Sequence, residues 1–397
     1  MDMSTPRVIL IIADACGIGE LPDAADYGDT GAATVPNVAA AVGGLSMPAC
    51  QALGLGNIVE IEGVPPAPAP AACFGKMAER SPGKDSTTGH WEIGGVILDA
   101  PFPVFPDGFP PDLVARFEAA VGVKAIGNVA ASGTEIVERL GEEHLKSGAL
   151  ILYTSADSVF QVAAHEAMYP PKRLYEICQT ARDLLIGEFD VGRVIARPFE
   201  GRPGQFVRTS RRRDFSRTPP EDTLLDVMAR NDLRTLAIGK IKDLYAGRGI
   251  DSAVKAANND EVMEAAKEAV SENGGHALVF ANCVDFDMLW GHRNDERSFA
   301  RGLESFDRHL SELLLLLRED DVLVITADHG CDPTIKSSTD HTREYVPLLV
   351  HGRRLKSGVD LGTRSTFADL ATTLAEAYDL PDCFPGTSMW SEMTNAH

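Results

Sequence analysis

Carboxylates and histidines occur together at the ends of apolar runs in this sequence. Asp328 and His329 follow one such run, Asp287 and His292 follow another, and His341 lies in a polar stretch before a further run. A carboxylate that leaves a buried strand is costly unless a partner or a cation neutralises its charge. One such pair can be a structural contact, but three groups together favour metal ligands. Mixed Asp and His sets suit Zn²⁺ or Mn²⁺, and more than four candidates imply two ions.

Two neighbouring ions can activate a nucleophile and hold a phosphoryl group during in-line displacement, so these residues predict phosphate chemistry. The motif Gly83–Glu92 supplies candidate nucleophilic hydroxyls in Ser86, Thr87 and Thr88. Ser and Thr also begin ordinary helices, but the backbone N–H groups of a helix N-terminus can bind phosphate. Such a hydroxyl becomes a strong nucleophile only when a metal or a base lowers its pKa.

Alternating strands and helices must position these residues. Apolar runs end at polar residues, and between them lie helical patterns such as Phe299 to Leu317, with apolar residues three or four positions apart. This alternation predicts an α/β fold with buried parallel strands. Because ligands bind beyond the carboxyl ends of such strands, we expect Asp14, Asp287 and Asp328 to meet there. The predicted strands are Val8–Ala13, Leu150–Tyr153, Thr235–Gly239, Ala277–Val284 and Val322–Thr326.

The length of the chain and two Pro-containing segments predict two domains. The chain has 397 residues, and Pro101–Pro110 and Arg211–Pro220 have compositions typical of linkers. The stretch between them has helix and strand patterns of its own. We therefore predict a core with a mostly parallel sheet between helices, made of residues 1–102 and 219–397, in which the second part supplies most metal ligands. Residues 103–218 would form a smaller inserted α/β cap domain.

Charge and apolar content argue against several classes of protein. The 37 Lys and Arg against 58 Asp and Glu give a net charge of −21, which disfavours nucleic acid and membrane partners. The longest purely apolar run, Leu313–Leu317, is far too short for a membrane span. Seven scattered cysteines without CxxC spacing favour a reducing compartment, so we expect a cytoplasmic protein. The basic stretch Arg208–Arg217 fits a solvated loop or a site for a small phosphorylated ligand.

Ordered motifs over almost the whole chain resemble the bacterial phosphopentomutases of the alkaline phosphatase superfamily. The matching strings are Asp14 with Gly17–Glu20, Leu53–Asn57, Gly83–Glu92, Thr154–Ser158, Gly192–Pro198, Ala237–Lys240, Val284–Asp287, Ala327–Gly330 and Thr339–Pro347. The resemblance implies an alkaline-phosphatase-like core, an inserted cap and two Mn²⁺ ions beside a hydroxyl residue that becomes phosphorylated.

The resemblance also assigns roles to individual residues. It places Asp287, His292 and His341 on one ion. It places Asp14, Asp328 and His329 on the other. The family nucleophile is usually Thr, but this position holds Ser86, with Thr87 and Thr88 as alternatives. A second departure is Cys331, where the family commonly has Asn. Substrate contacts, any of which could instead be a structural partner, would come from Ser155, Asp157, Val159, Arg193, Ile195 and Lys240.

The implied reaction interconverts α-D-ribose 1-phosphate, or 2-deoxyribose 1-phosphate, and the 5-phosphate. It would proceed through a phosphoenzyme and a bisphosphate intermediate, with a sugar bisphosphate primer such as glucose 1,6-bisphosphate. The alternatives are another two-metal phosphotransferase of the superfamily, similar to phosphoglycerate mutase or to a phosphatase, and a metal-binding scaffold without catalysis.

Overall fold

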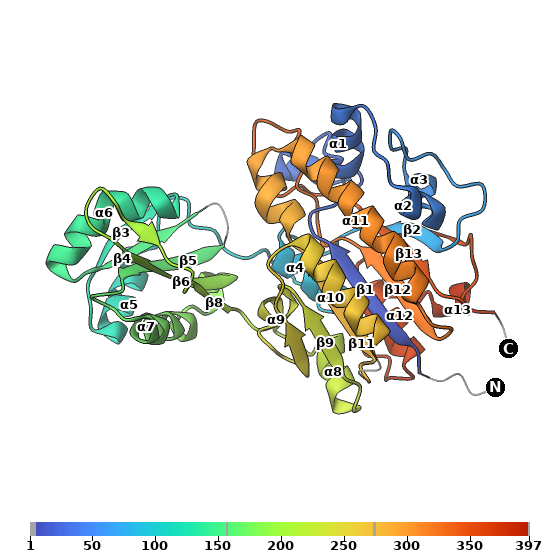
Figure 1. The fold of residues 1–397 in the computed structure, drawn as a ribbon. Helices are drawn as coiled ribbons and strands as arrows, with labels where there is room; N and C mark the ends of the chain where they lie inside the picture. The colour runs from blue at the N-terminus through green and yellow to red at the C-terminus, as the bar shows by residue number, and fades with distance from the viewer. Residues whose placement is uncertain (1–4, 156–157, 273–274, 396–397) are drawn as a thin grey trace. The chain divides into compact units, whose positions relative to one another are not determined.

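The protein is described here by a computed structural model that covers residues 5–155, 158–272 and 275–395. The chain forms two compact units (Figure 1). One unit combines Met1–Pro101 with Pro219–His397, and the other consists of Phe102–Thr218. None of the helices in the covered ranges combines the length and the apolar content that a membrane span needs.

The first unit is built on one sheet of eight strands. They are β1 (Arg7–Ala13), β2 (Cys73–Met77), β9 (Thr235–Ile238), β10 (Ser252–Val254), β11 (Leu278–Cys283), β12 (Asp321–Thr326), β13 (Val346–His351) and β14 (Asp360–Arg364). Their order is β10-β9-β11-β1-β12-β13-β2-β14. The strands from β10 to β12 run parallel, and β13 is antiparallel to both of its neighbours. The prediction of a mostly parallel sheet is confirmed.

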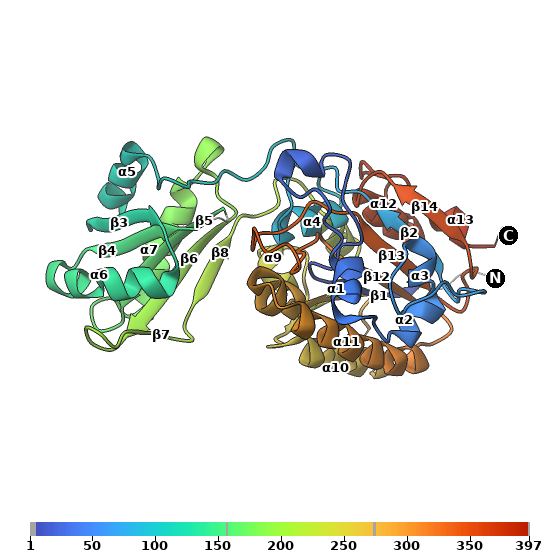
Figure 2. The same cartoon turned by 90° about the horizontal axis from the view of Figure 1, so that it is seen from above.

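Helices cover both faces of this sheet. They are α1 (Thr34–Val42), α2 (Pro48–Leu53), α3 (Leu55–Ile58), α4 (Ser86–Ile93), α8 (Leu224–Arg230), α9 (Ile241–Leu244), α10 (Asn259–Ser271), α11 (Glu296–Leu316), α12 (Ala368–Ala377) and α13 (Trp390–Met393). Figure 2 shows α10 and α11 on one face and α12 on the other. The predicted apolar stripe of α11 is buried, including Phe299, Phe306 and Leu310, because its three- and four-residue spacing faces the sheet side.

The second unit has a sheet of its own. Its strands are β3 (Ala125–Ala130), β4 (Leu150–Thr154), β5 (Val159–His165), β6 (Arg193–Glu200), β7 (Val207–Arg208) and β8 (Arg213–Ser216). Strands β3 to β7 follow one another in the sheet, and β8 also pairs with β6. Helices α5 (Pro111–Val121) and α7 (Pro171–Leu184) lie on one face and α6 (Gly133–Ser147) on the other (Figure 1). The α/β prediction therefore holds for this unit too.

The interpretation of Arg211–Pro220 as a linker was wrong in part. Strand β8 lies inside it and pairs antiparallel with β6, and its Phe215 side chain is buried in the core under α7. The basic stretch is also more than a solvated loop, because its arginines pair with carboxylates. Arg212 lies 2.6 Å from Asp214 and Arg217 lies 2.7 Å from Asp190. Within this strand the apolar Phe215 lies between polar residues, a pattern that is compatible with a strand. The prolines that follow it favoured the linker interpretation instead.

Asp307 on α11 provides a test of the packing around the sheet. Its buried carboxylate accepts hydrogen bonds from Ala49 N at 3.0 Å and Cys50 N at 2.7 Å, at the start of α2. Asp307→Ala would leave these N–H groups buried without an acceptor, so we expect a loss of about 1–3 kcal/mol in the free energy of unfolding. Urea denaturation measures it. Leu315→Ala, at a side chain 82% exposed on the same helix, is the control and should change stability little. An equal effect of both changes would contradict the role of Asp307.

Candidate metal centre and nucleophile

Three carboxylates meet beyond the carboxyl ends of adjacent strands. Asp14 directly follows β1, and Asp328 follows β12 after one intervening residue. Asp287 lies in a short π-helical turn, Phe286–Trp290, just after β11. Strands β11, β1 and β12 are neighbours in the sheet, so their ends bring these three residues together. All three side chains are buried.

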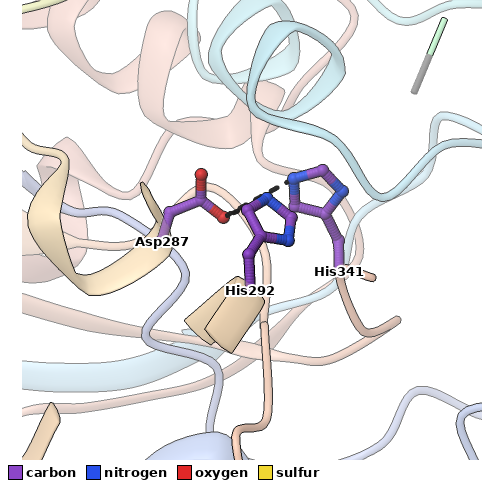
Figure 3. A group of neighbouring side chains, drawn as sticks. All are labelled: Asp287, His292 and His341. Carbon is purple, nitrogen blue, oxygen red and sulfur yellow. Dashed lines mark ion pairs between the residues drawn. The ribbon is translucent and has the colours of Figure 1, made fainter. Parts of the chain in front are cut away.

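The first group of potential metal ligands consists of Asp287, His292 and His341 (Figure 3). Asp287 Oδ1 lies 3.2 Å from His292 Nε2 and 3.5 Å from His341 Nε2. The other ring nitrogens have partners that orient the rings. His292 Nδ1 lies 2.6 Å from the carbonyl of Thr339, and His341 Nδ1 lies 3.2 Å from Asp340 Oδ1. This leaves both Nε2 atoms directed at the same carboxylate oxygen, an arrangement typical of metal-binding histidines.

The second group consists of Asp14, Asp287 and His329, so Asp287 belongs to both. His329 Nε2 lies 3.3 Å from Asp14 Oδ1 and 3.4 Å from Asp328 Oδ2. The rings of His329 and His341 are 4.5 Å apart between centroids, which joins the two groups. The structure thus brings together all six residues that the sequence suggested as ligands, with Asp287 between the two sets.

The buried carboxylates of this cluster favour the binding of cations. Asp14 Oδ1, Asp287 Oδ1 and Asp328 Oδ2 are buried and have no hydrogen-bond partner among the residues covered. Burial alone would raise the pKa of Asp287, but the adjacent ring of His292 and the charge of His341 lower it far below its usual value. Burial would likewise lower the pKa of His329, yet Asp328 and Asp14 raise it well above its usual value. Unpaired carboxylate oxygens facing imidazoles fit divalent cations well.

The candidate nucleophile Ser86 is the first residue of α4. Asp85 caps this helix by accepting hydrogen bonds from the backbone N–H groups of its second and third residues. The hydroxyl of Thr88 is occupied, because it donates to Asp85 Oδ2 at 2.6 Å. Ser86 Oγ instead lies 3.2 Å from His329 Nε2 and 3.4 Å from Lys240 Nζ. Ser86 therefore faces the candidate metal ligands, whereas Thr88 serves the cap.

A buried arginine that sequence reasoning did not assign holds the loop before Ser86. Arg343 Nη1 donates to the carbonyls of Ser81 at 2.8 Å and Gly83 at 2.6 Å, and Nη2 donates to the carbonyl of Glu79 at 3.0 Å. Its charge pairs with Glu79 Oε2 at 2.9 Å. Arg343 is only 3% exposed, so these bonds are shielded from water. The arginine lay in a matching motif, but its partners are more than 250 positions away in sequence.

Lys84 ties the same loop to a candidate metal ligand. Its Nζ donates to Asp29 Oδ2 at 3.0 Å and lies 3.4 Å from Asp340 Oδ2. Asp340 in turn contacts His341 Nδ1, as described above. Burial would raise the pKa of Asp340, but the hydrogen bond to His341 and the charge of Lys84 lower it far below its usual value. A movement of Lys84 would therefore change the surroundings of His341 through Asp340.

The predicted substrate residues fall into two places. Lys240 lies in the first unit, beside Ser86. In the second unit, Val159 and Arg193 face each other across the β5–β6 ladder, and Ile195 lies two residues further along β6 on the same face. Ser155 follows β4 and is partly exposed, while Asp157 lies outside the described residues. Arg193 also lies 3.5 Å from Asp214, which is the structural alternative for this residue.

Cys331 lies behind the first ligand group. Its side chain is buried, and Sγ lies 3.8 Å from His292 Nδ1 and 3.6 Å from the carbonyl of Asp340. The thiol is therefore close to groups that orient two candidate metal ligands.

A third group of potential ligands, Glu264, His309 and Glu312, lies on the surface between α10 and α11. Lys267 Nζ is already there, 2.8 Å from Glu264 Oε1 and 3.2 Å from His309 Nδ1, and it also donates to Glu312. The ammonium group occupies the centre of this cluster and offsets part of its negative charge, which distinguishes this group from the buried ones.

The fold and the site together define an enzyme class. The family model described as Metalloenzyme superfamily matches residues 6–382. Relatives named phosphopentomutase include one from Acetivibrio thermocellus, 54% identical over 96% of this chain and 98% of the relative, and one from Clostridium novyi, 52% identical over 98% and 99%. The chain therefore belongs to the phosphopentomutase family of the metalloenzyme superfamily, which confirms the resemblance seen in the sequence.

Comparison with solved structures supports the fold alone. A protein from Pyrococcus horikoshii superposes with a TM-score of 0.50 at 16% identity, over 96% of this chain and all of that one. The overall fold is thus shared with this solved structure. The family match and the two groups of candidate ligands together support the use of divalent metal ions.

Glu344 holds segments that adjoin the candidate metal ligands. Its buried carboxylate accepts hydrogen bonds from Thr34 N at 2.8 Å, Thr34 Oγ1 at 2.6 Å, Gly19 N at 3.2 Å and Thr342 Oγ1 at 2.6 Å. Burial nevertheless raises the pKa of Glu344 to about 7. The folded protein therefore binds this proton more tightly than the unfolded chain, in which Glu has a pKa of about 4.3.

The raised pKa of Glu344 predicts a pH-dependent stability. Its contribution should be complete below about pH 4 and should be lost as the pH rises toward about 7, because ionisation is easier in the unfolded chain. Glu344→Gln removes this titration. We expect the wild-type protein to lose stability relative to the variant over this pH range, measured by urea denaturation with a chelator present. A difference between the two proteins that does not change with pH would contradict the assignment.

Proposed function

We propose that this protein interconverts α-D-ribose 1-phosphate, or its 2-deoxy analogue, and the corresponding 5-phosphate. The observation that carries this proposal is the hydroxyl of Ser86 at the start of α4, 3.2 Å from His329 within the cluster of buried carboxylates and imidazoles. The full-length relatives named phosphopentomutase support the choice of substrate. The sugar phosphate is small and negatively charged, and the protein is strongly acidic. Its binding therefore requires cations in the site.

Two cation positions follow from the ligand groups. Asp287, His292 and His341 would hold one ion, and Asp14, Asp328 and His329 the other, with Asp287 close to both. We propose Mn²⁺ for both. When bound, these ions would supply positive charge that favours the ionised form of Ser86 and offsets charge on the transferring phosphoryl group.

The reaction would begin from phosphorylated Ser86, formed with a sugar bisphosphate such as glucose 1,6-bisphosphate. The 5-hydroxyl of ribose 1-phosphate attacks the phosphorus, the P–Oγ bond breaks, and the hydroxyl proton passes to Ser86 Oγ. This gives ribose 1,5-bisphosphate. Ser86 Oγ then attacks the 1-phosphate, its proton passes to the sugar oxygen, and ribose 5-phosphate leaves. Lys240, 3.4 Å from Ser86 Oγ, would place a positive charge beside both transfers.

The second unit is proposed to be the cap domain that binds the sugar. Ser155, Val159, Arg193 and Ile195, with Asp157, would contact the ribose and its other phosphate, because Arg suits phosphate oxygens and Ser and Asp suit hydroxyls. Exclusion of water would favour transfer to the sugar over hydrolysis. A cytoplasmic location, where such phosphosugars occur, is part of the same proposal.

The turnover assay combines the purified protein with Mn²⁺, glucose 1,6-bisphosphate and ribose 1-phosphate. We expect ribose 5-phosphate to accumulate with little free phosphate, and the reaction to stop when the metal is chelated. Release of phosphate at the rate of sugar conversion would identify a phosphatase instead. Conversion of 3-phosphoglycerate but not of ribose 1-phosphate would identify a different mutase. Either result would overturn the proposed function.

Ser86→Ala should abolish the phosphoenzyme, because the variant lacks the oxygen that accepts the phosphoryl group. Incubation with radiolabelled glucose 1,6-bisphosphate and mass spectrometry of the peptides measures the label. Ser86→Thr is the matched control, since it restores the residue usual in the family and should keep both label and turnover. Label that persists on Thr87 or Thr88 in the alanine variant would show that the nucleophile is a neighbour of Ser86.

The shared position of Asp287 predicts unequal effects of ligand substitutions. Asp287→Ala should remove or weaken both ions, whereas His292→Ala should affect one, because only Asp287 belongs to both groups. Mn²⁺ content after equilibrium dialysis distinguishes the two results. Glu264→Ala, in the surface group that Lys267 occupies, is the control and should keep the wild-type content. Equal losses in the Asp287 and His292 variants would exclude a shared ligand.

A further inference from the structure

A buried amide lies next to the candidate metal centre, on an otherwise apolar strand. Asn282 belongs to β11, where it is level with Ile12 of β1, and its side chain is fully buried. An amide in this position costs free energy unless its N–H groups find acceptors. Asn282 Nδ2 donates to Asp14 Oδ2 at 2.9 Å and lies 3.2 Å from His90 Nε2. The amide therefore links a candidate metal ligand to a histidine of α4.

His90 continues this link to a second candidate ligand and to the nucleophile. The ring is completely buried, and its Nδ1 lies 3.0 Å from Asp328 Oδ2 and 2.8 Å from the carbonyl of Ser86. Because Nδ1 faces two acceptors and Nε2 faces an amide N–H, the ring donates from Nδ1 and accepts at Nε2. The reverse orientation of the Asn282 amide is disfavoured, since it would place Oδ1 against the carboxylate of Asp14.

The chain of contacts determines which carboxylate oxygens are free. Asn282 engages Asp14 Oδ2, which leaves Asp14 Oδ1, buried and without a hydrogen bond, directed toward His329 at 3.3 Å. Asp328 is held from two sides, because Oδ1 accepts from Ala15 N at 3.2 Å and Oδ2 faces His90. Asp14 Oδ1 and Asp328 Oδ2 thereby both face His329 Nε2, which lies 3.2 Å from Ser86 Oγ. No corresponding contact of Asn282 or His90 reaches His292 or His341 among the residues covered.

We propose that Asn282 and His90 are positioning residues that orient Asp14 and Asp328 and so set the affinity of one of the two cation sites. The proposal rests on the proposed function, because it needs the cations of that site. Groups that orient metal ligands typically change affinity by roughly 10- to 100-fold when removed. Asn282 and His90 should affect the ion held by Asp14, Asp328 and His329, while the ion held by His292 and His341 should bind as before.

The test is a titration of metal-free protein with Mn²⁺, in which electron paramagnetic resonance reports the free ion. For Asn282→Ala we expect one of the two binding steps to weaken by roughly 10- to 100-fold and the other to keep its affinity. Turnover should fall at limiting Mn²⁺ and recover when Mn²⁺ is raised. Asn57→Ala is the matched control, since Asn57 also makes two hydrogen bonds, both to Ala67, away from this site. It should leave both steps unchanged.

A second variant keeps the test valid if Asn282→Ala folds poorly. His90→Asn retains a donor near the position of Nδ1 but loses the acceptor for Asn282, so it should weaken the same step by a smaller factor. Equal weakening of both steps, or no weakening in either variant, would overturn the positioning role while leaving the proposed function intact. Absence of Mn²⁺ binding by the wild-type protein would instead overturn the proposed metal centre itself.

Discussion

The burial of three carboxylates at adjacent strand ends is the constraint on which the rest of this structure depends. Asp14, Asp287 and Asp328 lie beyond β1, β11 and β12, and each has an oxygen that no hydrogen bond satisfies among the residues covered. Negative charges this close repel one another, and removal from water adds to the cost. The surrounding histidines offset part of this energetic cost. Divalent cations would neutralise the remainder, and the same charge makes the site suited to phosphate.

The neighbourhood of the carboxylates is organised around this charge. Strands β11, β1 and β12 are parallel and adjacent, so the three residues that follow them lie at one edge of the sheet without long loops. Helix α4 then brings Ser86 to the same edge, and the side chain of Asp85 caps the N-terminus of this helix. The loop before it is fixed by Arg343 and by Glu92, which accepts hydrogen bonds from Arg80 N and Ser81 N. These hydrogen bonds hold the loop that leads to the candidate nucleophile.

Much of this site could be predicted from the sequence because it depends on local patterns. Apolar runs that end at Asp14 or near Asp328 predicted both the parallel strands and the candidate ligands, and the stripe of α11 followed from its spacing. Family motifs then indicated Ser86 as the candidate nucleophile. The contacts of Arg343 and Asn282 could not be predicted, because each joins residues far apart in sequence. A polar amide within the apolar run of β11 was the one available signal for Asn282. The shared position of Asp287 likewise depends on three-dimensional geometry.

The central claim, that divalent cations neutralise the buried carboxylates, is tested most directly by thermal unfolding of metal-free protein during a titration with Mn²⁺. An ion that binds only the folded state raises the unfolding temperature. The account predicts a rise that saturates at two ions per chain and reverses with a chelator. An unfolding temperature that does not respond to Mn²⁺ or to other divalent cations would contradict it.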